Sequence, residues 1–125
     1  MAMTWFPQGI GELDIPQVRA LSDRYGAEGL GFYIAAKTEL YRAAANGCEL
    51  DRQALSKAVA RACGIGARKA GNMLDFAEKS GVFRLKTDGK LESAVYNVQE
   101  EVNRYETVSD QRKRAAKARW WQEEM

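Results

Sequence analysis

Two adjacent basic residues lie among several glycines in this sequence, a combination that could bind a phosphate group. Residues 63–74 read CGIGARKAGNML, in which Arg68 and Lys69 would suit a phosphate group. Gly64, Gly66 and Gly71 resemble the glycines of a nucleotide-binding fingerprint. A dinucleotide fingerprint or a P-loop needs a strand that runs into its glycine turn, and a P-loop also needs the sequence GK[ST]. The flanking sequence therefore decides between a phosphate loop and the turn of a DNA-binding motif.

A helix, and not a strand, is predicted to precede this stretch. Asp51 is a favoured N-cap residue type, Leu55 and Val59 recur at helical spacing, and Gly64 ends the run. The sequence GK[ST] is also missing. These two observations exclude a nucleotide-binding loop.

The helical pattern resumes directly after the glycine turn and stops at Ser80-Gly81. The apolar face of this second helix is predicted to consist of Ala70, Met73, Leu74 and Ala77. Two short helices joined by a turn match a helix-turn-helix, in which the second helix lays its N-terminal residues in the DNA major groove. An αα-hairpin within a helical bundle is the alternative.

Three polar residues near the start of the second helix are the first candidates for DNA contact. Positive charge at a helix N-terminus is unfavourable unless an anion lies nearby, so Arg68 and Lys69 are predicted to contact phosphates. Asn72 lies one turn further and could hydrogen-bond a base edge. Gly66 is an acceptable N-cap but supplies no side-chain acceptor.

A β-hairpin is predicted after the second helix. Residues 82–86 form a strand-like run with Phe83 and Leu85 on one side, and Asp88-Gly89 is a hairpin turn signal. Lys86 and Lys90 flank this turn and are candidate phosphate contacts, although lysines on hairpins also serve solubility. A hairpin in this place predicts a winged helix.

Two further helices are predicted upstream. The first begins at Pro16 and stops at Gly26, and the second closes at Asn46-Gly47. The apolar stripe of the second helix is predicted to consist of Leu30, Tyr33, Ile34, Leu40, Tyr41 and Ala44. Residues 48–50, CEL, would suit a short edge strand.

The C-terminal part of the chain predicts one more helix. Its first residues keep a heptad-like seam, formed by Val95, Val98, Val102 and Tyr105. The apolar repeat stops after Tyr105. The helix is therefore predicted to pack on the body, or on a second subunit, up to Tyr105 and then to leave it. A basic run follows, consisting of Arg112, Lys113, Arg114, Lys117 and Arg119. This run could bind phosphate or an acidic partner, and a solvated tail is the alternative. Trp120 and Trp121 are expected to pack on the body, on another chain or on nucleic acid.

Composition narrows the function classes. With 125 residues, the chain is one domain or one domain plus a tail. Its formal net charge of +2 does not by itself indicate nucleic-acid binding.

No signal peptide or membrane span is recognisable, which predicts a cytoplasmic protein. The chain has no histidine, so neither an ordinary zinc site nor the commonest general base is available, and no cofactor or metal is expected. Cys48 and Cys63 are predicted to be small buried residues. Acidic pairs such as Glu12 with Asp14 are expected to lie in a turn-like or solvated helical context that explains them without chemistry, so an enzyme is the weakest option.

Several short sequence segments follow one another along nearly the whole chain. They are WFPQ before a short helix, ALSDRYGAEGLGFYIAAKTELYR as the first helices, CEL as a short strand, ACGIGARKAGNMLDFAEKSGVF leading into the wing, and SDQRKRAAKARWW as the tail. In this order they resemble the N-terminal winged-helix domain of phage replisome-organiser and replication-initiation proteins, which also occurs in bacterial chromosomes as a domain of unknown function. Related proteins often place Ser or Asp followed by acids where this chain has Gly66-Ala67-Arg68-Lys69.

The resemblance implies a non-catalytic module that binds double-stranded DNA or helps to assemble a replisome, with replisome or helicase-loading proteins as further partners. The fold is predicted to be mostly α with a small β hairpin, a winged helix-turn-helix with an extra N-terminal helix and a long C-terminal helix. Residues 1–95 are expected to form the winged-helix domain, and residues 96–125 the C-terminal helix and basic tail. The alternatives are a protein-interaction or homodimerisation module, with residues 95–105 as the dimer seam, and a small transcriptional regulator.

Overall fold

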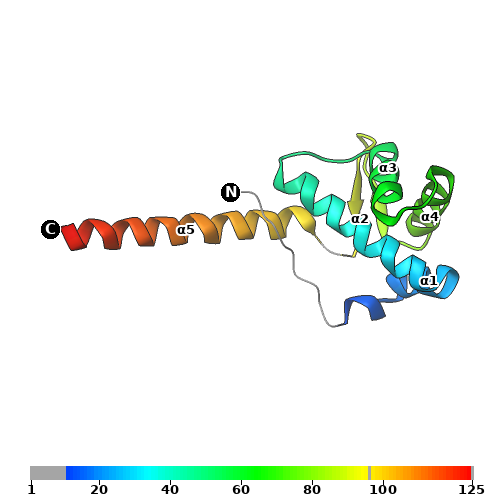
Figure 1. Ribbon diagram of the computed structural model, residues 1–125, viewed down its shortest axis with the longest axis horizontal. Coiled ribbons are helices and arrows are strands. Elements are labelled where there is room, and N and C mark those ends of the chain that lie inside the picture. Colours follow the sequence, from blue (N-terminus) through cyan, green and yellow to red (C-terminus); the bar gives the residue numbers. More distant parts are fainter. Residues whose placement is uncertain (1–10, 96, 125) are drawn as a thin grey trace.

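The computed structural model describes residues 11–95 and 97–124, with side chains up to residue 119. The phrase WFPQ and the side chains of Trp120 and Trp121 lie outside the described residues. The described chain is mostly helical with a two-stranded antiparallel sheet, which confirms the predicted secondary-structure content (Figure 1). Its elements are the 3-10 helix η1 (Glu12–Asp14), α1 (Pro16–Tyr25), α2 (Ala27–Ala45), α3 (Arg52–Cys63), α4 (Ala67–Lys79), β1 (Phe83–Leu85), β2 (Leu91–Ser93) and α5 (Val98–Glu124).

Helices α1 and α2 pack together at very short range. Pro16 occupies the first turn of α1 and Gly26 ends it, as predicted. In α2, a Cβ atom at Gly29 would lie only 2.2 Å from the carbonyl oxygen of Leu21 in α1. Only glycine permits the two backbones to approach this closely.

The start of α3 and the turn into α4 follow from local backbone chemistry. The amide N–H of Ala54 donates to Asp51 Oδ1 at 2.8 Å, which confirms Asp51 as the N-cap of α3. Gly64 ends α3 in the left-handed conformation, with φ of 66°, and α4 begins at Ala67, directly after Gly66. Glycine adopts this conformation without the steric cost that a Cβ atom brings, so the position of the turn is fixed by the sequence.

The core lies between α1, α2, α3, α4 and the hairpin, and the start of α5 packs against it. Its largest fully buried side chains are Val18, Leu21, Phe32, Tyr33, Leu55, Val59, Met73, Leu74, Val82 and Val102. The predicted stripe of α2 was partly wrong. Ile34 is 42% exposed, whereas Phe32 and Lys37 are buried.

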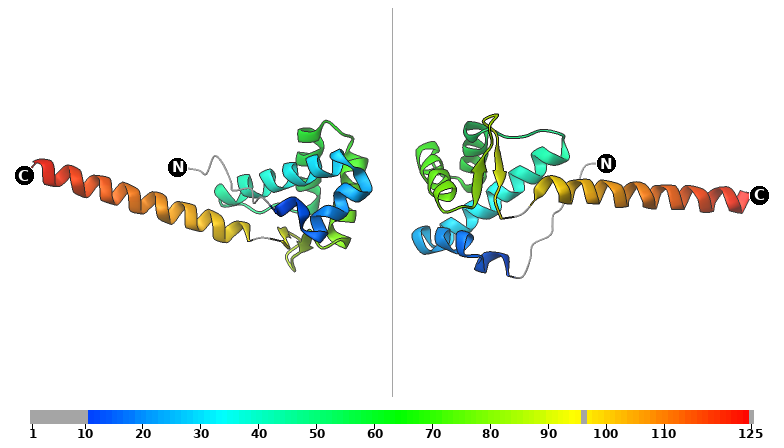
Figure 2. Two further views of the ribbon diagram at one scale, coloured as in Figure 1. Left: turned by 90° about the horizontal axis from the view of Figure 1, so that it is seen from below. Right: turned by 180° about the vertical axis from the view of Figure 1, so that it is seen from behind.

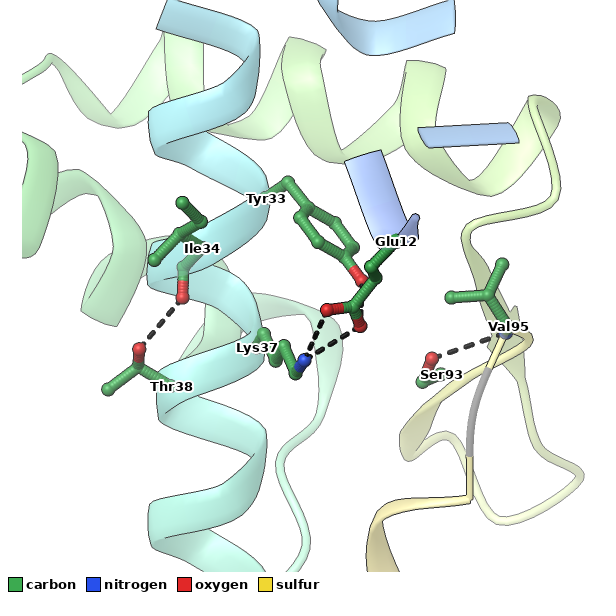
Figure 3. Close-up of polar contacts among 7 residues, drawn as sticks. All are labelled: Glu12, Tyr33, Ile34, Lys37, Thr38, Ser93 and Val95. Atoms are coloured by element: carbon green, nitrogen blue, oxygen red, sulfur yellow. Dashed lines mark hydrogen bonds and ion pairs between the residues drawn. The ribbon is translucent and has the colours of Figure 1, made fainter. Parts of the chain in front are cut away.

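A buried polar cluster attaches η1 to α2 (Figure 3). Lys37 Nζ donates to both carboxylate oxygens of Glu12, at 2.7 and 2.6 Å, and the hydroxyl of Tyr33 donates to Glu12 Oε1 at 2.7 Å. The side chains of Lys37 and Glu12 are only 3% and 10% exposed. Glu12 and Asp14 were predicted to lie in a turn-like context, and they form the short 3-10 helix η1, but the pairing of Glu12 with a lysine 25 positions away was not predicted.

The hairpin is shorter than its sequence pattern suggested. Phe83 lies opposite Ser93, and Leu85 opposite Leu91. Leu85 was predicted to share the core side with Phe83, but it is 55% exposed, although Leu91 directly opposite it is buried. Residues 48–50 form no strand, although Leu91 N donates to Leu50 O at 2.9 Å and Asp51 bridges to Lys90.

Helix α5 packs on α2 by its first turns and then leaves the body (Figure 1). Val102 is buried, and Val95 and Val98 pack partly buried against the core. From Glu106 to residue 119 the side chains are exposed, apart from a half-buried Ser109. The predicted departure after Tyr105 is confirmed, and the 95–105 seam packs on the chain's own body. Among the described residues no helix is both long and apolar enough for a membrane span.

Candidate nucleic-acid interface

Helix α4 has one buried face and one exposed polar face. The buried face consists of the predicted residues Ala70, Met73, Leu74 and Ala77. The exposed polar stripe begins with Arg68 and Asn72 and continues through the partly exposed Asp75 to Lys79, at spacings of four, three and four. These spacings place the side chains on one side of the helix. Lys79 was not among the predicted DNA contacts, although its helical spacing from Arg68 could have identified it.

The two predicted phosphate contacts at the start of α4 differ in their surroundings. Lys69 Nζ forms an ion pair with Glu28 Oε1 of α2 at 2.5 Å. Arg68 is exposed and makes no ion pair with any other described residue. Arg68 is therefore the available cation of the pair, while Lys69 also ties α4 to α2.

The N-terminus of α4 is open to an anion. No acidic residue lies in its first turn, and Gly66 provides no side-chain cap. The first N–H groups of a helix have no partner within the helix, and its dipole favours negative charge there. An exposed arginine in the same turn adds to this preference.

An arginine of α3 neutralises the negative charges of the two acidic residues in α4. Arg52 forms ion pairs with both Asp75 and Glu78, the latter at 3.1 Å between Nη1 and Oε2. Asp75 lies on the exposed stripe, so its charge would otherwise oppose that of Arg68 and Lys79. The pairing with Arg52 leaves the exposed stripe with a net positive character and fixes α4 against α3.

The two hairpin lysines are not equivalent to Arg68. Lys86 donates to both carboxylate oxygens of Glu49, at 2.9 and 2.8 Å, and this hydrogen bonding raises the pKa of the Lys86 ammonium. Its charge is therefore already balanced within the protein. Lys90 is half-buried beside Asp51, with which its backbone forms the bridge.

The basic residues of the tail lie far from α4. Arg112, Lys113, Arg114, Lys117 and Arg119 are all exposed, and within the described part of the chain none of them has an ion-pair partner. Helix α5 leaves the body on the side opposite α4 (Figures 1 and 2). The structure thus brings Arg68, Lys69 and Asn72 together but separates the tail from them.

A cleft of about 560 Å³ lies between α2, the hairpin and the start of α5. Apolar side chains from all these elements line it, among them Leu40, Leu91 and Val98. Charged side chains also line it, including the paired Lys86 and Glu49. This cleft was not predictable from the sequence, because its walls come from separate parts of the chain.

In the part of the chain that the structure describes, the two cysteines do not share a metal site with carboxylates. Among the described residues there is no group of three or more potential metal ligands. Cys48 is exposed, so its predicted burial was wrong, whereas Cys63 is half-buried. Burial, and then the carboxylate of Glu28, raise the pKa of the Cys63 thiol, which disfavours the reactive thiolate.

Comparison of this chain with protein-family models, with curated proteins and with solved structures found no match.

Proposed function

We propose that this protein is a non-catalytic winged-helix module that binds double-stranded DNA through the exposed stripe of α4. One observation carries the proposal: Arg68 is exposed and unpaired among the described residues, at a helix N-terminus without acidic residues. In this arrangement the guanidinium and the free N–H groups of the first turn bind backbone phosphates. Asn72, one turn further, faces a base edge in the major groove.

The order of the elements supports a winged helix. Helices α3 and α4 are joined by the short turn at Gly64, and the β1–β2 hairpin follows α4 directly. The hairpin is the wing in this proposal, but Lys86 contributes little to DNA affinity because Glu49 neutralises it. A role in the initiation of phage or prophage DNA replication is part of the proposal and rests on the resemblance of the sequence phrases alone.

Titration of a labelled DNA duplex at several salt concentrations tests the proposal. Binding through Z phosphates weakens with a log-log slope of about −0.9Z. We expect weak binding at low salt, and we expect Arg68→Ala to lower affinity and to flatten this slope by about one unit. Asn72→Ala should reduce discrimination between sequences and leave the slope unchanged.

Arg42→Ala is the matched control. Arg42 is also an exposed arginine, in the last turn of α2, and it pairs with Glu39 in the same helix. Its removal should leave DNA affinity unchanged. Failure of the wild-type protein to bind at low salt, or equal losses for Arg68→Ala and Arg42→Ala, would overturn the proposal.

A further inference from the structure

The basic segment of α5, residues 111–119, is an uncovered surface with a single sign of charge. It holds five basic residues and no acid, a net charge of +5 over about 13 Å of helix. The acids of α5 lie before residue 111 and after residue 122. All side chains of the segment are exposed, and among the described residues none of the five bases has an ion-pair partner. The segment therefore fits a partner with many closely spaced negative charges.

The five bases surround most of the helix and do not share one narrow face. At about 100° per residue, they occupy an arc of roughly 220° around the helix axis. Lys113 and Lys117 lie near the middle of this arc, Arg112 and Arg119 lie near one edge, and Arg114 lies near the other. A partner that contacts all five must therefore enclose the helix on more than one side.

This distribution of charge distinguishes between the polyanions that could bind. A flat acidic protein surface or a membrane contacts one side of a helix, so bases at the two edges of the arc would face away from it. An interfacial membrane helix also carries large apolar side chains opposite its bases, whereas the opposite arc of the basic segment consists of Gln111, Ala115 and Ala118. The major groove of B-form DNA is about 12 Å wide, admits a whole α-helix and has a phosphate backbone on each side. The groove is therefore the partner that places phosphates beside both edges of the arc.

We propose that the basic segment is a second DNA-binding element, which lies in the major groove of a duplex. In this arrangement Arg112 and Arg119 contact the phosphates of one strand, and Arg114 contacts those of the other. Lys113 and Lys117 point into the groove, where lysines bind guanine acceptors. The basic regions of known DNA-binding helices lie in the major groove in the same way, as continuous helices that project from a separately folded part.

The position of the basic segment makes its duplex a different one from the duplex at α4. The body of the protein lies between α4 and the distal part of α5 (Figures 1 and 2). The buried face of α4 packs on the core, so its exposed stripe faces away from the core. A straight duplex at one site therefore does not reach the other. With the function proposed for α4, on which this step rests, one chain holds two duplex segments at once.

Salt titrations of the full chain with a labelled duplex of about 21 base pairs, two helical turns, test the second site. They are made in the Arg68→Ala background, in which α4 contributes less to binding. Arg112→Gln/Arg114→Gln removes one cation from each edge of the arc and should flatten the log-log slope by about two units. Arg19→Gln/Arg42→Gln is the matched control, because it removes two exposed arginines from α1 and α2 and should leave the slope unchanged.

Two neighbouring alanines distinguish binding in a groove from nonspecific attraction to a charged tail. Ala116 lies within the basic arc, and Ala115 lies outside it. In the same background, Ala116→Glu should remove about one phosphate contact, a change of about 0.9 in the slope, whereas Ala115→Glu should leave the slope nearly unchanged. Equal effects would overturn the proposal, because the total charge of the segment would then determine binding.

Capture of a second duplex tests whether one chain holds two. Beads that carry an unlabelled duplex with bound protein should retain a labelled duplex from solution. Arg68→Ala and Arg112→Gln/Arg114→Gln should each reduce this retention, and Arg19→Gln/Arg42→Gln should not. Full retention by Arg112→Gln/Arg114→Gln would overturn the proposal, since a dimer with two α4 surfaces would then join the duplexes. So would tighter binding of the wild type to poly-glutamate or to phosphatidylserine vesicles than to DNA.

The two DNA sites fail separately in these assays. If Arg112→Gln/Arg114→Gln flattens the salt slope but Arg68→Ala has no effect, the basic segment binds DNA and the function proposed for α4 is wrong. If Arg68→Ala alone has an effect, the function of α4 stands and the second site is refuted.

Discussion

The contact between α1 and α2 makes substitution of Gly29 a sharp test of the fold. A Cβ atom at this position would lie 2.2 Å from the carbonyl oxygen and 2.7 Å from the carbonyl carbon of Leu21. Both atoms belong to the backbone, so no side-chain rotation can relieve the overlap. Gly29→Ala therefore requires α1 to move away from α2, and α1 supplies the buried Val18 and Leu21 to the core.

The expected loss of stability follows from two opposing terms. Alanine in place of glycine within a helix stabilises it by about 1 kcal/mol. Overpacking against a rigid neighbour costs about 3 kcal/mol, the upper part of the usual range, because the neighbour is backbone. The net loss is roughly 2 kcal/mol. Unfolding entropy of about 2.1 cal/mol/K per residue then converts this loss to a fall of roughly 8 °C in Tm for a chain of this length.

Gly31→Ala is the matched control for this prediction. Gly31 lies in the same helix, and nothing lies within 4 Å of a Cβ atom placed there. It should therefore show the propensity term alone, a rise of about 4 °C in Tm. Thermal and urea unfolding followed by circular dichroism would measure both variants. If Gly29→Ala matched or exceeded the wild type in Tm, the close approach of α1 and α2 would be refuted.

Three further predictions concern single side chains. Lys37→Met leaves the carboxylate of Glu12 buried without its cation and should lower the free energy of unfolding by about 3 kcal/mol in urea titrations; a loss below 1 kcal/mol would contradict a buried pair. Asp51→Ala removes the N-cap of α3 and should cost about 1 kcal/mol, whereas Asp51→Asn, which keeps an acceptor oxygen, should cost much less in the same assay. Cys63, with its raised thiol pKa, should react more slowly with iodoacetamide than the exposed Cys48, as peptide mass spectrometry would show; equal rates would argue against its burial.

The limits of the helices were predictable because local backbone chemistry sets them. Gly26 and Gly64 adopt positive φ values that favour glycine, and Asp51 caps the next helix with its own carboxylate. Each of these effects acts within a few residues of the chain. The buried face of α4 was also predictable, since its apolar residues have clear helical spacing.

The errors arose where distant parts of the chain meet. Apolar residues occur almost all round α2, so spacing alone could not separate the exposed Ile34 from the buried Phe32. Lys37 is buried only because Glu12 reaches it from 25 positions upstream. The same holds for the candidate DNA surface: Lys86 looked as free as Arg68 in the sequence, but Glu49, 37 positions away, pairs with it. Among these residues, a local pattern identified the cations and could not identify their partners.

The projecting α5 has a consequence for hydrodynamic measurements. Its 27 residues span about 40 Å, whereas a compact chain of this size has a radius of gyration of about 14 Å. A single copy should therefore tumble anisotropically and elute from a sizing column ahead of a compact protein of equal mass. Small-angle scattering should show this elongation directly, as a pair-distance distribution with a long tail. Elution volume alone would report a false dimer, so the mass of the particle must come from scattering or sedimentation.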